Sequence, residues 1–302
     1  GANGRVYALF ERAAGQDKRR PATALLVSVD CDGNQVWSRN VAPSPLSRPA
    51  ASPVLAADAL VLQTAELAAL DALTGTELWR CPLPDDKAYG TPVKARVYET
   101  PILITAWGSL LRVSDGQVLA EGLPRLAGSS PVVEAGIVCF CGNRAGDGRA
   151  AAAAFRLPRT FEVPLKLEAL WSREEPEGVK YDGSPLLKDG LLYALTVDGA
   201  LRVRDARTGE PLYERGLLAE AERSGPRAPG NLICAGERIY AVNLGKRTRT
   251  IVFEPGRTFK QVWEYAVVNG TGDPAFAGDR QFVRGEWNLY CLAGRPPRPP
   301  VE

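Results

Sequence analysis

The chain has 302 residues, of which 45% are hydrophobic, so it can bury a large apolar core. Its 37 basic and 35 acidic residues give a formal net charge of +2 with no basic stripe, which argues against nucleic acid as a partner. No apolar run approaches the roughly 20 residues that span a membrane, and the absence of histidine excludes a histidine base, metal ligand or pH switch.

A short sequence pattern recurs along the chain and predicts a repeat architecture. Residues 69–79 read Ala-Leu-Asp-Ala-Leu-Thr-Gly-Thr-Glu-Leu-Trp, residues 203–213 are a close copy, and residues 28–37 are a looser one. With three weaker copies, the repeats end at intervals of 41 to 51 residues, at Trp37, Trp79, Ala120, Trp171, Tyr213 and Trp263. This period is typical of the four-stranded blade of a β-propeller, with insertions in the longer repeats.

Counted in chain order, the repeats number seven and cover residues 4–42, 50–83, 91–123, 128–173, 183–217, 229–268 and 273–293. Most open with a Ser-Pro, Thr-Pro or Asp-Pro pair, because proline at the first residue of a strand removes no ladder donor. The sequence therefore predicts an all-β, seven-bladed β-propeller of four-stranded blades, with eight blades as the alternative.

The individual strands are clearest in the fifth repeat. There, glycine turns suited to hairpins separate four predicted strands at residues 186–187, 191–196, 200–205 and 211–214. In the fourth repeat, the alanine run 150–154 has helical propensity, but the phase of the repeat predicts a strand.

The first and last repeats are incomplete. The first begins with its second strand, at residues 4–10, and the last has no fourth strand after residues 288–292. Propellers commonly close by letting one terminus complete a blade begun by the other, which removes open sheet edges. We therefore expect a segment upstream of Gly1 to supply the missing strands. Residues 1–294 are predicted to be one propeller domain, and the Pro- and Arg-rich residues 295–302 an extended tail.

The polar and thiol side chains of the repeat have simple structural interpretations. Asp30, Asp71 and Asp205 precede turns and are expected to accept hydrogen bonds from the turn backbone. The cysteines form no CxxC motif and no adjacent pair, so we expect small buried hydrophobic side chains and no metal site at Cys31, Cys81, Cys139, Cys141, Cys234 and Cys291.

The Leu-Asp-Ala-x-Thr-Gly-x-x-Leu-Trp pattern and the Ser-Pro-Val-Val openings resemble the pyrroloquinoline-quinone-type β-propeller repeat family over nearly the whole chain. Residues 181–194, 252–257 and 288–292 look like a subgroup common in planctomycetes and related bacteria. One branch of the family contains dehydrogenases that bind the quinone and a calcium ion in the central channel, commonly beside an adjacent-cysteine disulfide and an Asp proposed as base. Another branch resembles the propeller lipoprotein of the outer-membrane protein assembly machinery, a non-catalytic scaffold.

The absence of adjacent cysteines, and of a placeable set of Asp, Asn and Glu residues, favours the scaffold branch. The resemblance then implies an exported protein, periplasmic or extracellular, that binds protein partners without a cofactor. A quinone- and calcium-dependent dehydrogenase, or a propeller that binds a small ligand or carbohydrate, is the alternative.

Two tryptophans, Trp107 and Trp287, depart from the repeat because they fall at turns between the second and third strands. Aromatic residues with nearby cations are favoured anchors of interfaces, and loops on a rigid scaffold often carry function. The predicted interaction patch on the rim consists of Trp107, Trp287, Tyr89, Tyr181, Arg48 and Lys180; the alternative is that each packs against a neighbouring loop. The fourth-strand tryptophans are instead expected to pack between blades: Trp37, Trp79, Trp171 and Trp263.

Overall fold

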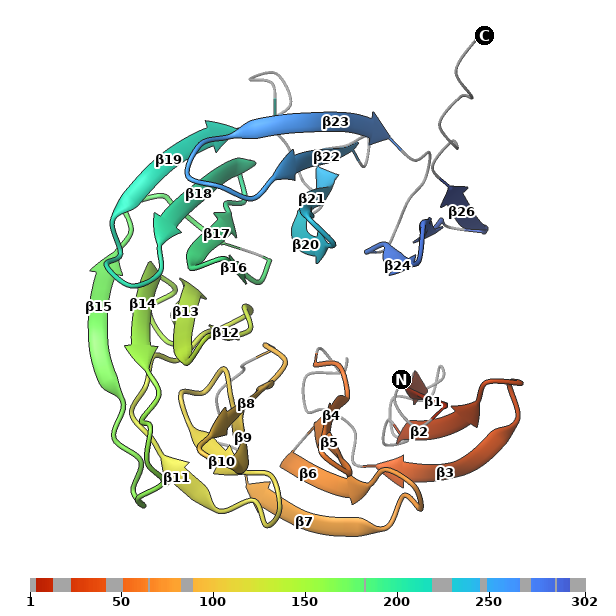
Figure 1. Ribbon diagram of the computed structural model, residues 1–302. Helices are drawn as coiled ribbons and strands as arrows, with labels where there is room; N and C mark the ends of the chain where they lie inside the picture. Colours follow the sequence, from red (N-terminus) through yellow and green to blue (C-terminus); the bar gives the residue numbers. More distant parts are fainter. Residues whose placement is uncertain are drawn as a thin grey trace, which may run out of the picture. The chain divides into compact units, whose positions relative to one another are not determined.

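A computed structural model describes residues 4–12, 23–41, 51–64, 66–82, 89–181, 183–218, 230–244, 249–266, 273–285 and 287–293. This part of the chain forms seven antiparallel sheets, five with four strands and two with three (Figure 1). The prediction of an all-β, seven-bladed β-propeller is confirmed. We number the sheets as blades 1 to 7 and name the strands of each blade A to D; blade 1 contains strands B to D and blade 7 contains strands A to C. No helix in the described part of the chain is long and apolar enough to cross a membrane.

The chain divides into two compact units, Gly1–Gly178 with Arg207–Gly209, and Val179–Ala206 with Glu210–Glu302. The first holds blades 1 to 4, with strands β1 (Arg5–Arg12), β2 (Thr23–Asp30) and β3 (Gln35–Val41); β4 (Val54–Ala56), β5 (Ala59–Gln63), β6 (Glu66–Asp71) and β7 (Glu77–Pro82); β8 (Val93–Val97), β9 (Thr100–Ile104), β10 (Leu110–Arg112) and β11 (Val118–Ala120); and β12 (Val132–Glu134), β13 (Ile137–Asn143), β14 (Ala150–Arg156) and β15 (Glu168–Glu174).

The second unit holds the strands of blades 5 to 7, which are β16 (Leu186–Lys188), β17 (Leu191–Leu195), β18 (Ala200–Asp205) and β19 (Pro211–Gly216); β20 (Asn231–Ala235), β21 (Arg238–Leu244), β22 (Arg249–Glu254) and β23 (Lys260–Ala266); and β24 (Ala275–Ala277), β25 (Arg280–Arg284) and β26 (Leu289–Ala293). The predicted strands of the fifth repeat and the predicted strand at the alanine run, now β14, are confirmed.

In the four-stranded blades, strands B and C lie in the middle of the sheet and carry most of the apolar core. All five residues of β5 and all five of β17 are buried. In the first unit one core cluster joins blades 2 to 4 around Ile102, Leu110 and Phe140. In the second unit the core joins blades 5 and 6 around Tyr193 and Phe253.

A tryptophan–glycine contact repeats between neighbouring repeats of the first unit. The glycine of a C–D turn lies against the indole that precedes it, and in each case its φ is positive: Gly75 (70°) on Trp37, Gly116 (70°) on Trp79 and Gly209 (72°) on Trp171. A methyl group placed on these glycines would lie 2.8, 2.5 and 2.5 Å from the ring. Only glycine combines this backbone conformation with this close approach. The expected packing of Trp37, Trp79 and Trp171 is therefore confirmed.

Hydrogen bonds fix the same turns. The indole Nε1 of Trp37 donates to the carbonyl of Ala72 at 3.2 Å, and that of Trp79 to the carbonyl of Val113 at 2.7 Å. The carboxylate of Asp71 accepts hydrogen bonds from the backbone N–H groups of Leu73 and Thr74 and from the hydroxyl of Thr74. These bonds hold the pKa of Asp71 below its ordinary value, and the Thr74 hydroxyl contributes most. The turn role expected for Asp71 and Asp30 is thus confirmed.

Candidate functional site

The residues predicted to form an interaction patch on the rim differ in their exposure. Trp287 is 86% exposed at the B–C turn of blade 7, and Tyr89 and Lys180 are also exposed. Trp107 and Tyr181 are buried, at 6% and 3%, so their prediction as exposed anchors is wrong. Arg48 lies outside the described residues.

The burial of Trp107 has a local cause. The chain after β11 folds back over its turn, so that Leu123 N–H donates to the carbonyl of Gly108 and Leu126 N–H to that of Ala106. Gly108 is so close to this segment that a methyl group on it would lie 2.1 Å from the carbonyl oxygen of Leu123. This covering segment hides the indole.

Tyr181 is covered in a similar way within the second unit. Its residue forms a bridge with Thr196 at the B–C turn of blade 5, and the neighbouring Lys180 carbonyl accepts from Val197 N–H at 2.8 Å. Neither of these covering contacts is visible in the repeat pattern, because each joins a turn to a loop outside its own hairpin.

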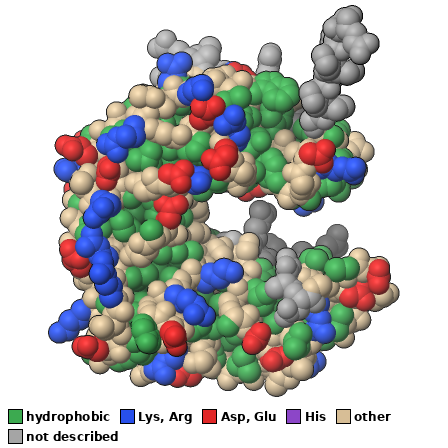
Figure 2. All heavy atoms as spheres, viewed as in Figure 1, with side chains coloured by type: hydrophobic (Ala, Val, Ile, Leu, Met, Phe, Trp, Pro, Cys, Tyr) green, Lys and Arg blue, Asp and Glu red, His purple; other side chains and the backbone are tan. Residues whose placement is uncertain are grey.

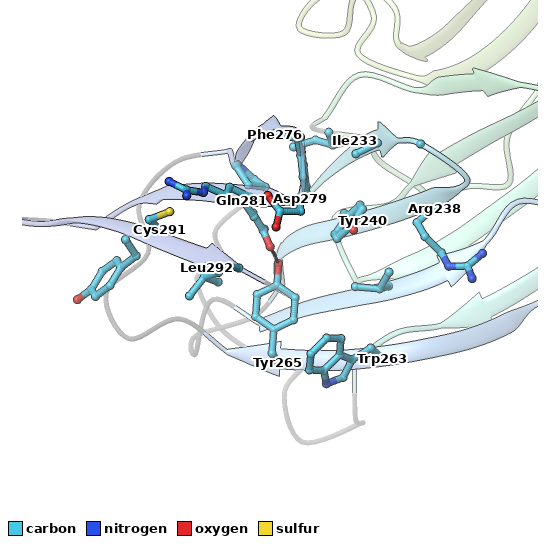
Figure 3. A pocket seen from close by; sticks show the side chains of 18 of the residues that line it. Ile233, Arg238, Tyr240, Trp263, Tyr265, Phe276, Asp279, Gln281, Cys291 and Leu292 are labelled. Carbon is cyan, nitrogen blue, oxygen red and sulfur yellow. Dashed lines mark hydrogen bonds between the residues drawn. The ribbon is translucent and has the colours of Figure 1, made fainter. Parts of the chain in front are cut away.

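A large cavity lies between blades 6 and 7 of the second unit. Its volume is about 1430 Å³, and most of its lining is apolar or aromatic (Figure 3). Tyr240 of blade 6 and Phe276 of blade 7, which both line the cavity, are in contact, with ring centroids 4.7 Å apart and ring planes tilted by 49°. The hydroxyl of Tyr265 points across the cavity and donates to Gln281 Oε1 at 2.8 Å. Burial raises the pKa of Tyr265.

Trp263 lines this cavity and corrects two expectations. It was expected to pack between blades, yet it is 66% exposed, because no described C–D turn of blade 7 lies over it. Cys291, which lines the same cavity from β26, is also exposed, and so is Cys31. The expectation that all six cysteines are buried is therefore wrong for these two, while Cys139 and Cys141 are buried in β13 as expected.

Charged side chains of both signs lie on the surface of the described residues. Figure 2 shows acidic and basic side chains interspersed on the face in view, and many form ion pairs, such as Arg144 with both Asp147 and Glu174. Within the described ranges, no three side chains of Cys, Asp or Glu lie close enough together to hold a metal ion. The sequence also contains no adjacent pair of cysteines.

Comparison with known proteins gives a consistent picture of the fold. A family model described as outer membrane protein assembly factor BamB matches residues 25–293. No curated protein matches the chain. Among solved structures, BamB from Moraxella catarrhalis is 18% identical, with a TM-score of 0.62 over 95% of this chain and 86% of that one.

Two other solved structures are similar at comparable levels. A europium-containing methanol dehydrogenase is 12% identical, with a TM-score of 0.64 over 93% of this chain and 73% of that one. The computationally designed Ika8 protein is 13% identical, with a TM-score of 0.63 over 95% and 82%. At these identities the similarities show the fold alone.

Proposed function

Because the chain belongs to the family of the outer membrane protein assembly factor BamB, we propose that it is an exported β-propeller scaffold that binds another protein and carries out no catalysis. The observation that carries the proposal is the side chain of Trp287, which is 86% exposed on a turn of blade 7. Two residues further along the chain, Leu289 is 70% exposed. Large aromatic side chains cost little conformational entropy when they are fixed and are enriched among the residues that dominate interface energies.

The test is site-specific photo-cross-linking in the cells that naturally make the protein. A photoreactive phenylalanine analogue replaces Trp287 in one variant and Tyr98 in a matched control, because Tyr98 is 73% exposed on a turn of the first unit. The expected result is a reproducible protein adduct from position 287 and none from position 98. Equal adduct yields from both positions, or none from either, would contradict the proposal.

The dehydrogenase alternative draws support from the fold similarity to a methanol dehydrogenase. It is tested by calorimetric titration of pyrroloquinoline quinone into the purified protein, with and without calcium. We expect no saturable heat under either condition, because the described residues do not provide the acidic ligands and adjacent cysteines of such a site. Saturable binding that requires calcium would replace the scaffold proposal with the enzymatic one.

A further inference from the structure

We infer that the rim of the second unit that carries Trp287 binds an acidic partner, namely a polypeptide segment in which a carboxylate lies beside apolar side chains. This inference rests on the proposed scaffold function and deepens it, because it names the chemistry of the protein that the rim binds. Three observations carry it: the common rim on which the B–C turns of blades 5 to 7 lie, the unpaired cations there, and the side chains around Trp287.

The first observation is that the B–C turns of blades 5, 6 and 7 lie at one rim of the second unit. The residues near the start of strand A are neighbours from blade to blade. The side-chain amide of Asn231, in β20, donates to both carboxylate oxygens of Asp273, shortly before β24, at 3.0 Å. A methyl group on Gly183, shortly before β16, would lie 2.8 Å from Asn231 Oδ1. Because neighbouring strands in each blade are antiparallel, the B–C turn lies at the end where strand A begins.

The second observation concerns charge, and it begins with two acidic side chains of this rim that are already engaged within the unit. Besides the bonds from Asn231, the carboxylate of Asp273 accepts one from the side-chain amide of Asn243 at 3.2 Å. Asp198, in the B–C turn of blade 5, accepts a hydrogen bond from the hydroxyl of Thr196. These two carboxylates therefore already have internal donors.

Two cations of the same rim are not engaged in this way. The carbonyl of Lys180 accepts from Val197 N–H at 2.8 Å, which places Lys180 beside the B–C turn of blade 5. Arg284 is the last residue of β25, directly before the B–C turn of blade 7. Both are exposed, and neither forms an ion pair with a residue that the structure describes. Positive charge is thus available to a partner, and interfaces pair such charge with the opposite sign.

The third observation is the apolar surface next to Arg284. The turn that carries Trp287 is closed by a hydrogen bond from Gly285 N–H to the carbonyl of Asn288 at 2.7 Å. Arg284 lies directly opposite Leu289 in the ladder of β25 and β26, so their side chains lie on the same face of the sheet. A guanidinium binds a carboxylate through two parallel hydrogen bonds, and both arginine and tryptophan are enriched among the residues that dominate interface energies.

These features fit an acidic polypeptide better than a nucleic acid. Binding to nucleic acid depends on many phosphate contacts, whereas we identify two unpaired cations among the described residues of this rim. The exposed side chains of Trp287 and Leu289 need apolar groups beside the anion, and a protein segment supplies both within a few residues.

The test combines charge reversal with the photo-cross-link at position 287, in the cells that naturally make the protein. Arg284→Glu should lower the yield of the protein adduct roughly tenfold, because like charges placed together oppose association. Arg284→Lys should retain most of the yield. The matched control is Arg280→Glu, at the other end of β25 and also exposed, which should leave the yield unchanged. An unchanged thermal midpoint shows that each variant is folded.

A second variant tests the sign of the partner's charge. Glu286 directly precedes Trp287 in the sequence. Glu286→Gln removes a negative charge, so an acidic partner should give an equal or higher adduct yield, whereas a basic partner should give a lower one. Mass spectrometry of the digested adduct should place the cross-link in a partner segment with a net negative charge.

The inference is overturned if Arg284→Glu leaves the yield unchanged, if Glu286→Gln lowers it, or if the cross-linked segment is neutral or basic. In each of these cases the protein adduct at position 287 still supports the scaffold function. An adduct with lipid or nucleic acid in place of protein, or no adduct from the parent protein at all, contradicts both this inference and the proposed function.

Discussion

At the scale of single residues, the contact between a tryptophan and the glycine of a later turn links one repeat to the next. Gly116 has a φ of 70° and lies against the ring of Trp79, so it meets both a backbone requirement and a steric one. Gly136 has a similar φ of 77°, but nothing lies within 4 Å of the position that a side chain would take. A comparison of substitutions at Gly116 and Gly136 therefore separates the cost of the positive φ from the cost of the steric contact with the ring.

We predict that Gly116→Ala destabilises the protein by roughly 3 kcal/mol, combining about 1–2 kcal/mol for a left-handed alanine with a further 1–3 for the collision with the ring. Gly136→Ala should cost only the about 1–2 kcal/mol of the left-handed alanine backbone, because no ring lies beside it. Urea denaturation followed by circular dichroism measures both. Equal losses of stability in the two variants would show that the ring moves aside freely.

Residue burial is also where reasoning from the sequence reaches its limit. The Ala-Trp-Gly turn at Trp107 and the Glu-Trp-Asn turn at Trp287 look alike in the repeat, yet their exposed fractions are 6% and 86%. The difference arises because residues 123–126 return to bond the turn at Trp107. A periodic pattern records strands and turns, but it does not record which distant loop covers a given turn.

At the scale of elements, the strands follow the repeat closely because each turn is fixed by local chemistry. The predicted strand 200–205 coincides with β18, and the strand predicted at 191–196 differs from β17 by one residue. The third and fourth strands join through turns with glycine and an Asp acceptor, which the sequence shows directly. The sequence also predicts no fourth strand after β26, and the described residues contain none, but it does not predict the exposure of Trp263.

Elements of different blades are also joined by single polar contacts. The hydroxyl of Tyr193 on β17 is fully buried and accepts a hydrogen bond from Gly256 N–H, at 2.8 Å, in the C–D turn of blade 6. We predict that Tyr193→Phe lowers the free energy of unfolding by about 1–2 kcal/mol, because the amide loses its acceptor in a partly buried place. Tyr98→Phe, on the surface, should change it by less than about 0.5 kcal/mol. A Tyr193→Phe variant as stable as the parent would show that solvent replaces the hydroxyl.

At the scale of the whole molecule, carboxyl groups at several turns give the fold a common response to acid. The pKa values of Asp30, Asp71 and Asp147 are lowered, mainly by side-chain hydrogen bonds from Asn34, Thr74 and Arg144 respectively. A carboxyl group whose folded-state pKa lies below its unfolded value binds fewer protons when folded. Its contribution is complete above the unfolded pKa, near 4, and is lost as the pH falls through the folded value.

We therefore predict that the thermal midpoint changes little between pH 7 and pH 5 and falls between pH 4 and pH 2. Asp71→Asn should reduce this acid-dependent fall, since an amide keeps the acceptor oxygen but does not titrate. Differential scanning calorimetry across the pH range measures the effect. If the variant and the parent lose the same number of degrees between pH 5 and pH 2, the turn at Asp71 does not contribute to acid sensitivity.

The tryptophan–glycine contacts also have a consequence for how the protein is made. The carbonyl that accepts the hydrogen bond from the indole of Trp37 lies 35 residues later in the chain, and the carbonyl that accepts from Trp79 lies 34 residues later. At roughly 5–20 residues per second, a ribosome delivers that partner only a few seconds after each tryptophan. During synthesis each of these two indoles therefore stays uncovered until the following repeat has emerged, so the exposed aromatic target for a chaperone moves from Trp37 to Trp79 as translation proceeds.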